Sequence, residues 1–286
     1  MSLILAVNET EALEDDVMAF LRARLTAALV NRLSPEPTIP SLRRRGVIAQ
    51  GDCAFATLLC GVDAQFAVLD TYQEQASYCK RYRESVFTNI FSRALFNQVE
   101  TARVDRGQPP GDCEYATLLE IGRLPATQVT AQHFWDVLAA HYQCNILLIV
   151  RNEPPRIPGQ QPSAALGYFL EMFVGVSQTW DACPKRWMLA FLLRGHFEPI
   201  VNSRNECVFS LEDSENSWLE HLTRHLFRGM AVMSSVSDMP QASVASGVRI
   251  SCGSLVRTVF SRASSFQFRH MLRFCQGFAL SPITVH

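Results

Sequence analysis

Cys53 stands where a glycine-containing turn enters a predicted helix, a setting that can activate a thiol. Gln50, Gly51 and Asp52 precede it, and the helix-favouring segment 54–59 follows. A helix N-terminus favours negative charge, so it stabilises the thiolate, which is the reactive form of cysteine. Its unpaired N–H groups can also hold an oxyanion, and Gly51 lets the backbone bend closely there. The pattern predicts a nucleophile at Cys53, with the three preceding residues forming its loop.

His196 is the histidine with the most informative neighbours. It follows Gly195 and opens a predicted strand over 196–201. Side chains alternate along a strand, so His196 and Glu198 point to one face while Phe197 points to the other. Glu198 can then orient the imidazole and stabilise the imidazolium, as the third member of a catalytic triad does. On spacing alone, an edge-strand histidine beside a solvated glutamate is the alternative.

A second Gly-Asp-Cys sequence makes Cys113 a rival nucleophile. It follows Gln108-Pro109-Pro110, however, and no strand is predicted before it. We therefore prefer Cys53.

The remaining histidines and cysteines predict neither a metal site nor a disulfide framework. His221 and His225 are spaced i, i+4 on a predicted helix, but no nearby Glu or Cys completes a recognised zinc pattern. The nine cysteines are an odd number without a C-x-x-C pair, which indicates a reduced, intracellular chain. We expect no metal and no other cofactor.

The hydrophobic pattern predicts the elements that must position these residues. Helices are expected over 10–33, 84–104, 129–142 and 216–228, the third with Thr130 as N-cap. Strands are expected over 144–150, 167–176, 187–193 and 196–201, the last two joined by a tight turn at Arg194-Gly195. Proline-rich connectors occupy 34–40 and 152–165. Helices gather in the first half and strands in the second, which indicates an α+β domain.

Composition limits the classes of function. Hydrophobic residues make up 48% of the 286 residues and charged residues 19%, enough to bury a core. The net charge of −1 gives no electrostatic reason to expect nucleic-acid binding. No apolar stretch approaches the length of a membrane span, and residues 1–7 lack a signal-peptide pattern. From about Met230 the chain becomes rich in Ser and Arg, so we place a boundary there and leave the role of 230–286 open.

Three blocks of sequence resemble the ovarian-tumour (OTU) family of cysteine proteases, in the family's order. Gln50-Gly51-Asp52-Cys53-Ala54-Phe55 is similar to the nucleophile motif Asp-Gly-Asn-Cys followed by an apolar residue and Phe. Gly195-His196-Phe197-Glu198-Pro199-Ile200 is similar to the strand that carries the catalytic histidine. Between them, 134–142 and 146–149 resemble the family's middle helix and following strand. The resemblance covers roughly residues 40–205.

The resemblance implies a papain-like, OTU-type α+β domain with a small, mostly antiparallel sheet packed between helices. The domain would span 1–229, with its core at about 40–205 and an N-terminal helix at 10–33. It implies a deubiquitinase that works in the cytoplasm, or in host cytoplasm if the chain comes from a virus or an intracellular bacterium. Its partner would be ubiquitin or a ubiquitin-like modifier, cleaved from its conjugates at the C-terminus.

Two residues depart from the family motif. Gln50 stands where the family commonly has Asp, and Asp52 where it usually has Asn. Glu198 therefore becomes the preferred orienting residue, by analogy with members that carry an acidic or amide residue two positions after the histidine.

Three alternatives stay open. The chain can be a weak or inactive OTU-fold module that binds ubiquitin. It can also be a papain-like protease or acyltransferase acting on other substrates, or an interaction protein whose motif matches are chance. Chain-linkage preference and oligomeric state cannot be read from the sequence.

Overall fold

A computed structural model describes residues 4–29, 37–49, 51–108, 114–123, 132–152, 167–193 and 195–237. Several predicted positions lie outside the described residues: Gln50, Cys113, Thr130, Arg194, most of both proline-rich connectors and everything from 238 on. The predicted boundary near 230 is therefore not tested.

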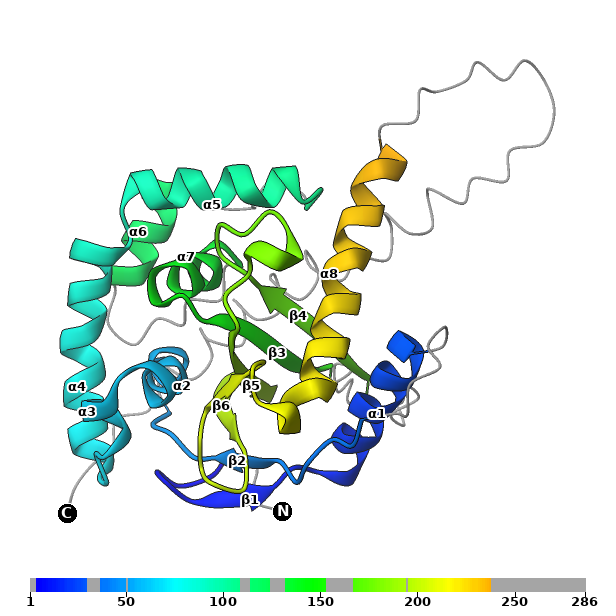
Figure 1. Ribbon diagram of the computed structural model, residues 1–286. Coiled ribbons are helices and arrows are strands. Elements are labelled where there is room, and N and C mark those ends of the chain that lie inside the picture. Colours follow the sequence, from blue (N-terminus) through cyan, green and yellow to red (C-terminus); the bar gives the residue numbers. More distant parts are fainter. Residues whose placement is uncertain are drawn as a thin grey trace, which may run out of the picture. The chain divides into compact units, whose positions relative to one another are not determined.

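Helices and strands alternate only in part along the chain (Figure 1). The helices are α1 (Asp15–Leu29), α2 (Cys53–Val62), α3 (Ala64–Ala67), α4 (Tyr72–Ser85), α5 (Arg93–Asp105), α6 (Tyr115–Arg123), α7 (Gln132–Tyr142) and α8 (Ser217–Ser237). A π-helical turn, η1 (Val86–Ile90), and two 3₁₀ turns, η2 (Trp180–Ala182) and η3 (Ser214–Asn216), join them. The strands are β1 (Thr10–Ala12), β2 (Arg43–Arg45), β3 (Asn145–Asn152), β4 (Gly167–Phe173), β5 (Arg186–Leu193), β6 (His196–Val201) and β7 (Val208–Ser210).

The described strands form one sheet in the order β1-β2-β6-β5-β3-β4, with β7 added to the start of β5. All pairs are antiparallel except β3 with β5. The mostly antiparallel sheet and the α+β class are as the sequence predicts. β2 pairs with Ile200 and Val201, at the far end of β6 from His196.

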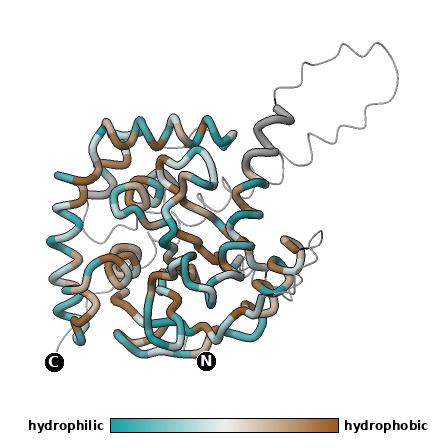
Figure 2. The backbone as a smooth tube through the Cα atoms, viewed as in Figure 1, coloured by the Kyte–Doolittle hydropathy of each residue, from teal (hydrophilic) through white to brown (hydrophobic). Residues whose placement is uncertain are grey.

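Two apolar layers cover the two faces of the sheet. In β3, Ile146, Leu148 and Val150 belong to one buried cluster, and Leu147 and Ile149 to the other, because successive side chains point to opposite faces. Helices α2, α4, α5 and α7 pack on the first face, and α1 and α8, which contact each other, cover the second (Figure 1). Figure 2 colours the backbone by hydropathy, and hydrophobic stretches recur along the central strands and α2.

The N-terminal helix is shorter than predicted. The sequence places a helix over 10–33, but Thr10–Ala12 form β1, and α1 begins at Asp15. β1 pairs with β2 and is the edge strand at one side of the sheet. Residues 10–12 form a strand because they pair with the distant residues Arg43–Arg45. A prediction from local hydrophobic periodicity cannot include that partner.

The helix predicted over 84–104 is interrupted. The chain leaves α4 through η1, and Ser92 then caps α5 by accepting a hydrogen bond from the Leu95 N–H at 3.2 Å. The apolar spacing survives the break, since Val86, Phe91, Phe96 and Val99 are all buried. Ser92 starts a new helix as its N-cap, and the break before it leaves the hydrophobic pattern on which the prediction rests unchanged.

The other predicted elements occur with small shifts in their ends. The predicted helix at 129–142 is α7, and the helix predicted over 216–228 is α8, which continues to Ser237. The four predicted strands are β3, β4, β5 and β6. Among the described helices, none combines the length and apolar character that crossing a bilayer requires.

Candidate active site

Cys53 is the first residue of α2, and a glycine turn brings the chain to it. Gly51 has φ of 82°, a left-handed conformation that glycine adopts without the steric cost of a Cβ atom. The Cys53 side chain is only 2% exposed. The backbone N–H groups of Phe197 and Ala54 and its own N–H donate to its sulfur. The thiol therefore lies against β6, beside the peptide that follows His196.

The surroundings of Cys53 hold it as a neutral thiol. Burial raises the pKa of Cys53 to about 11, and the negative charge of Asp52 adds to the increase. The three N–H groups act in the opposite direction, since they stabilise the thiolate, but they do not outweigh burial. At neutral pH the free protein therefore holds very little thiolate at this position.

His196 and Glu198 share one side of β6. Nε2 of His196 lies 3.7 Å from Oε1 of Glu198, and both side chains are buried. Burial, assisted by the positive charge of Arg44, lowers the pKa of His196 to about 4, so the imidazole is neutral near pH 7. Phe197 points to the other face and packs in the same cluster as Cys53. The Cys53 sulfur accepts the N–H of Phe197, the residue that follows His196 in β6.

Glu198 is held by two further groups from the N-terminal part of the chain. Its Oε2 accepts a hydrogen bond from Arg44 Nη1 at 2.9 Å, and its Oε1 accepts one from the Leu5 N–H at 3.2 Å. Arg44 also pairs with Glu11 at 2.7 Å. Burial raises the pKa of Glu198, while Arg44 and the Leu5 N–H oppose the increase by stabilising the carboxylate. These four residues, the exposed Glu11 and the buried Arg44, Leu5 and Glu198, are referred to below as the Arg44 network.

The carboxylate of Asp52 is held by Arg83. Arg83 of α4 donates from Nε to Asp52 Oδ1 at 2.8 Å and from Nη2 to the Gly51 carbonyl at 2.9 Å. The same guanidinium lies 4.8 Å from the centre of the Phe55 ring. Arg83 thereby fastens the turn before Cys53 to α4, and Asp52 serves as an anchor of the loop.

The structure places Cys53 at the start of α2 against the Phe197 N–H, His196 beside Glu198 on β6, and Gly51 and Asp52 in the turn before the thiol. Sequence reasoning missed Arg44 and Arg83, the two cations that hold these residues. A signal for Arg44 exists: it is the middle member of Arg43-Arg44-Arg45, so it faces the opposite side of β2 from its neighbours. Nothing local marks Arg83, which is one of several charged residues on α4.

Of the other candidates, one is outside the described residues and two lie elsewhere in the fold. Cys113, the rival nucleophile, lies outside the described residues. His221 and His225 lie on α8, whose buried residues pack on the opposite face of the sheet from α2. Within the described ranges, no group of three His, Cys, Asp or Glu side chains could hold a metal ion.

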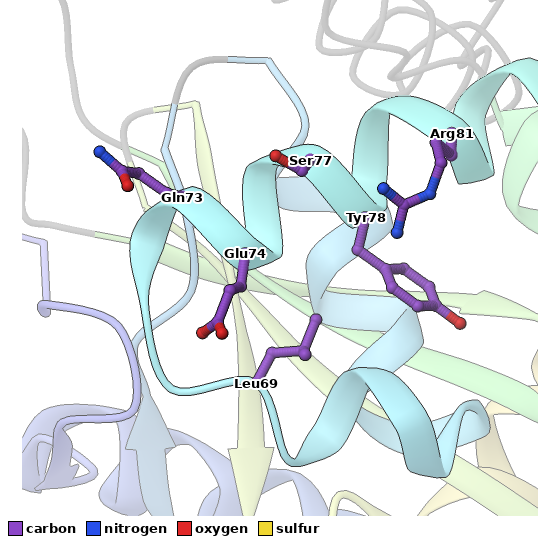
Figure 3. A pocket seen from close by; sticks show the side chains of 6 residues that line it. All are labelled: Leu69, Gln73, Glu74, Ser77, Tyr78 and Arg81. Atoms are coloured by element: carbon purple, nitrogen blue, oxygen red, sulfur yellow. The ribbon is translucent and has the colours of Figure 1, made fainter.

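A shallow surface pocket of about 290 Å³ lies on α4 and the turn before it (Figure 3). Its lining residues are Leu69, Gln73, Glu74, Ser77, Tyr78 and Arg81. None of the candidate catalytic residues lines it.

The sequence matches no protein-family model and no curated protein. Two solved structures are similar to the fold. One is an ovarian tumour (OTU) domain in complex with ubiquitin, with a TM-score of 0.38 and 13% identity over 69% of this chain and 89% of that chain. The other is the OTU domain of OTUD1, with a TM-score of 0.32 and 12% identity over 66% of this chain and 100% of that chain.

Proposed function

We propose that this protein is a cysteine-type deubiquitinase that cleaves isopeptide or peptide bonds at the C-terminus of ubiquitin or a ubiquitin-like protein. The observation that carries the proposal is the meeting of α2 and β6. The Cys53 thiol at the helix N-terminus accepts the Phe197 N–H, one residue beyond a histidine whose Nε2 faces a buried glutamate. The choice of ubiquitin rests on the resemblance of the sequence blocks around these residues to the OTU family.

In the free protein Cys53 is a neutral thiol and His196 a neutral imidazole, and this combination indicates general-base catalysis. His196 takes the proton from Cys53 as the sulfur attacks the carbonyl carbon at the C-terminus of the modifier. The resulting imidazolium is stabilised by Glu198, which faces Nε2. Backbone N–H groups at the start of α2 hold the oxyanion of the tetrahedral intermediate.

The rest of the cycle conserves atoms and charge. His196 returns the proton to the departing amine, and the C–N bond breaks to leave a thioester on Cys53. A water molecule, deprotonated by His196, then attacks the thioester, and the thiolate leaves and is reprotonated. No metal or organic cofactor takes part in these steps.

A ubiquitin-binding module with little or no activity is the second candidate. The observation that favours it is the burial of Cys53, whose side chain is 2% exposed and whose pKa is raised to about 11. Both features protect a thiol from chemistry. This candidate predicts binding to ubiquitin without a covalent bond.

The test is a reaction with ubiquitin that carries a thiol-reactive group at its C-terminus. Wild type, Cys53→Ala, Cys113→Ala and His196→Gln are each incubated with the probe, and the adduct is measured by intact-protein mass. We expect an adduct with wild type and with Cys113→Ala, none with Cys53→Ala, and much slower formation with His196→Gln.

Other results would select among the alternatives. An adduct lost only in Cys113→Ala would move the nucleophile to the second Gly-Asp-Cys. No adduct from wild type, together with a measurable affinity for ubiquitin, would leave the binding module. Hydrolysis of small thioesters or peptides without any reaction with ubiquitin would favour a papain-like enzyme on other substrates.

A further inference from the structure

The Arg44 network joins the proposed site to the N-terminal part of the chain. Arg44 is 1% exposed and Glu198 is fully buried, and they contact across the β2–β6 pair. The Leu5 N–H reaches the same carboxylate from a position 193 residues away in the sequence. Neither group is needed to explain the sheet, because the strand pairs already hold β1, β2 and β6 together.

We propose that Arg44 and the Leu5 N–H are positioning groups that keep Glu198 ionised and aimed at His196. This inference rests on the proposed function. A carboxyl group buried beside an imidazole tends to take up a proton, since burial disfavours its charged form. A protonated Glu198 cannot stabilise the imidazolium that forms when Cys53 loses its proton. Arg44 supplies the opposing charge.

The geometry divides the work between the two oxygens of Glu198. Arg44 occupies Oε2 at 2.9 Å, and the Leu5 N–H holds Oε1 at 3.2 Å, which is the oxygen that faces His196 Nε2. The carboxylate therefore cannot rotate without breaking one of these hydrogen bonds. Glu11, on the exposed side, fixes the far end of Arg44.

The first variants are Arg44→Met, Arg44→Lys and Arg103→Met. Arg103→Met is the matched control, because Arg103 and Asp136 form a second buried ion pair of similar exposure, with a distance of 2.8 Å, between α5 and α7. Both Met variants remove one cation from a buried pair. Only Arg44→Met removes the cation that pairs with Glu198, the carboxylate beside His196. Folding is monitored by circular dichroism, and each assay is run where the variant is folded.

The readout is the pH dependence of the rate of adduct formation with the ubiquitin probe. An opposite charge this close lowers an acid's pKa by roughly 1–3 units, so Arg44→Met should move the acid limb of the maximal rate upward by about that amount. On that limb the maximal rate at a fixed pH should fall about tenfold for each pH unit of the move, with half-saturation by the probe unchanged. Arg44→Lys should restore most of the rate. Arg103→Met should leave the acid limb in place.

Leu5 is tested by a pair of substitutions. Leu5→Pro removes the side chain and the N–H donor, whereas Leu5→Ala removes most of the side chain and keeps the donor. We expect a lower maximal rate in Leu5→Pro than in Leu5→Ala. Equal rates in the two would overturn the role given to the Leu5 N–H.

Infrared spectroscopy separates this inference from the proposed function, because it needs no substrate. Burial raises the pKa of Glu171 to about 7, so that group contributes a protonated-carboxyl band in wild type near neutral pH. The difference spectrum of Arg44→Met minus wild type should show an additional band of this kind, and the same difference for Arg44→Met/Glu198→Gln should lack it. If wild type forms no adduct but this band appears, the proposed function fails and the role of Arg44 in keeping Glu198 ionised stands. No band, with an unmoved acid limb in a reactive enzyme, overturns the role of Arg44.

Discussion

Replacing His196 by Gln tests how the site is buried, with no assumption about substrate. Burial holds the pKa of His196 at about 4, against 6.5 for the unfolded chain. Between these two values the unfolded chain binds a proton that the folded chain excludes. Folding stability contributed at this position is therefore intact above about pH 6.5 and falls as the pH drops toward 4.

The size of the effect follows from the two pKa values. Each pH unit inside this window costs about 1.4 kcal/mol, so acidification from pH 6.5 to 4 should remove about 3 kcal/mol of unfolding free energy through His196 alone. Glutamine does not titrate, so His196→Gln lacks this loss. The unfolding free energy of wild type minus that of the variant should thus fall by about 3 kcal/mol between pH 6.5 and pH 4, whatever the cost of the substitution itself.

The assay is urea unfolding at several pH values between 7 and 4, followed by circular dichroism. His225→Gln is the control, because it makes the same chemical change at an exposed position on α8. Titrating groups that do not contact the replaced histidine cancel in each difference. A wild-type-minus-His196→Gln difference that stays flat from pH 7 to 4 would show that the imidazole is not held neutral, and the mechanism proposed above would lose its base.

Three further predictions concern the thiol and the buried ion pairs. Alkylation of Cys53 by iodoacetamide, followed by peptide mass, should rise about tenfold per pH unit from pH 7 toward the pKa of about 11; a plateau near neutral pH would instead reveal a thiolate–imidazolium pair. At fixed pH, Asp52→Asn should speed this alkylation and Arg83→Met should slow it, because the charge of Asp52 raises the thiol's pKa and Arg83 neutralises that charge; the opposite order would contradict the assigned electrostatics. Asp136→Ala should destabilise the fold by roughly 3–5 kcal/mol in urea unfolding, since it leaves Arg103 buried without its anion; a cost below about 1 kcal/mol would show that Arg103 finds water or another partner.

The sequence predicts the local half of the site better than the long-range half. The turn-to-helix setting of Cys53 is visible in a few neighbouring residues, because glycine conformation and helix ends are local properties. The alternation that puts His196 and Glu198 on one side of a strand is also local. Burial of the thiol is a different matter, because it depends on how α2 packs against β6, and helix spacing alone does not report the depth of that contact.

The partners of the buried charges could not be predicted in this way. Arg44 and Glu198 are 154 positions apart in the sequence. Arg83 on α4 and Asp52 before α2 are 31 positions apart. Many arginines and carboxylates in the chain could form such pairs, and only the register of β2 on β6 selects Arg44. Residues 10–12 are a similar case. Their local sequence predicts a helix, but their pairing with distant β2 makes them strand β1.

The sheet order has a consequence for how the protein is made. β1 and β2 leave the ribosome first, but β6, the second partner of β2, ends at Val201, so β2 must wait for most of the domain to be synthesised before it pairs with β6. At typical elongation rates of about 5–20 residues per second, that delay lasts roughly 8–30 s. During this time Arg44 has no Glu198 to bind. A nascent chain cannot complete the proposed catalytic site until β6 has emerged.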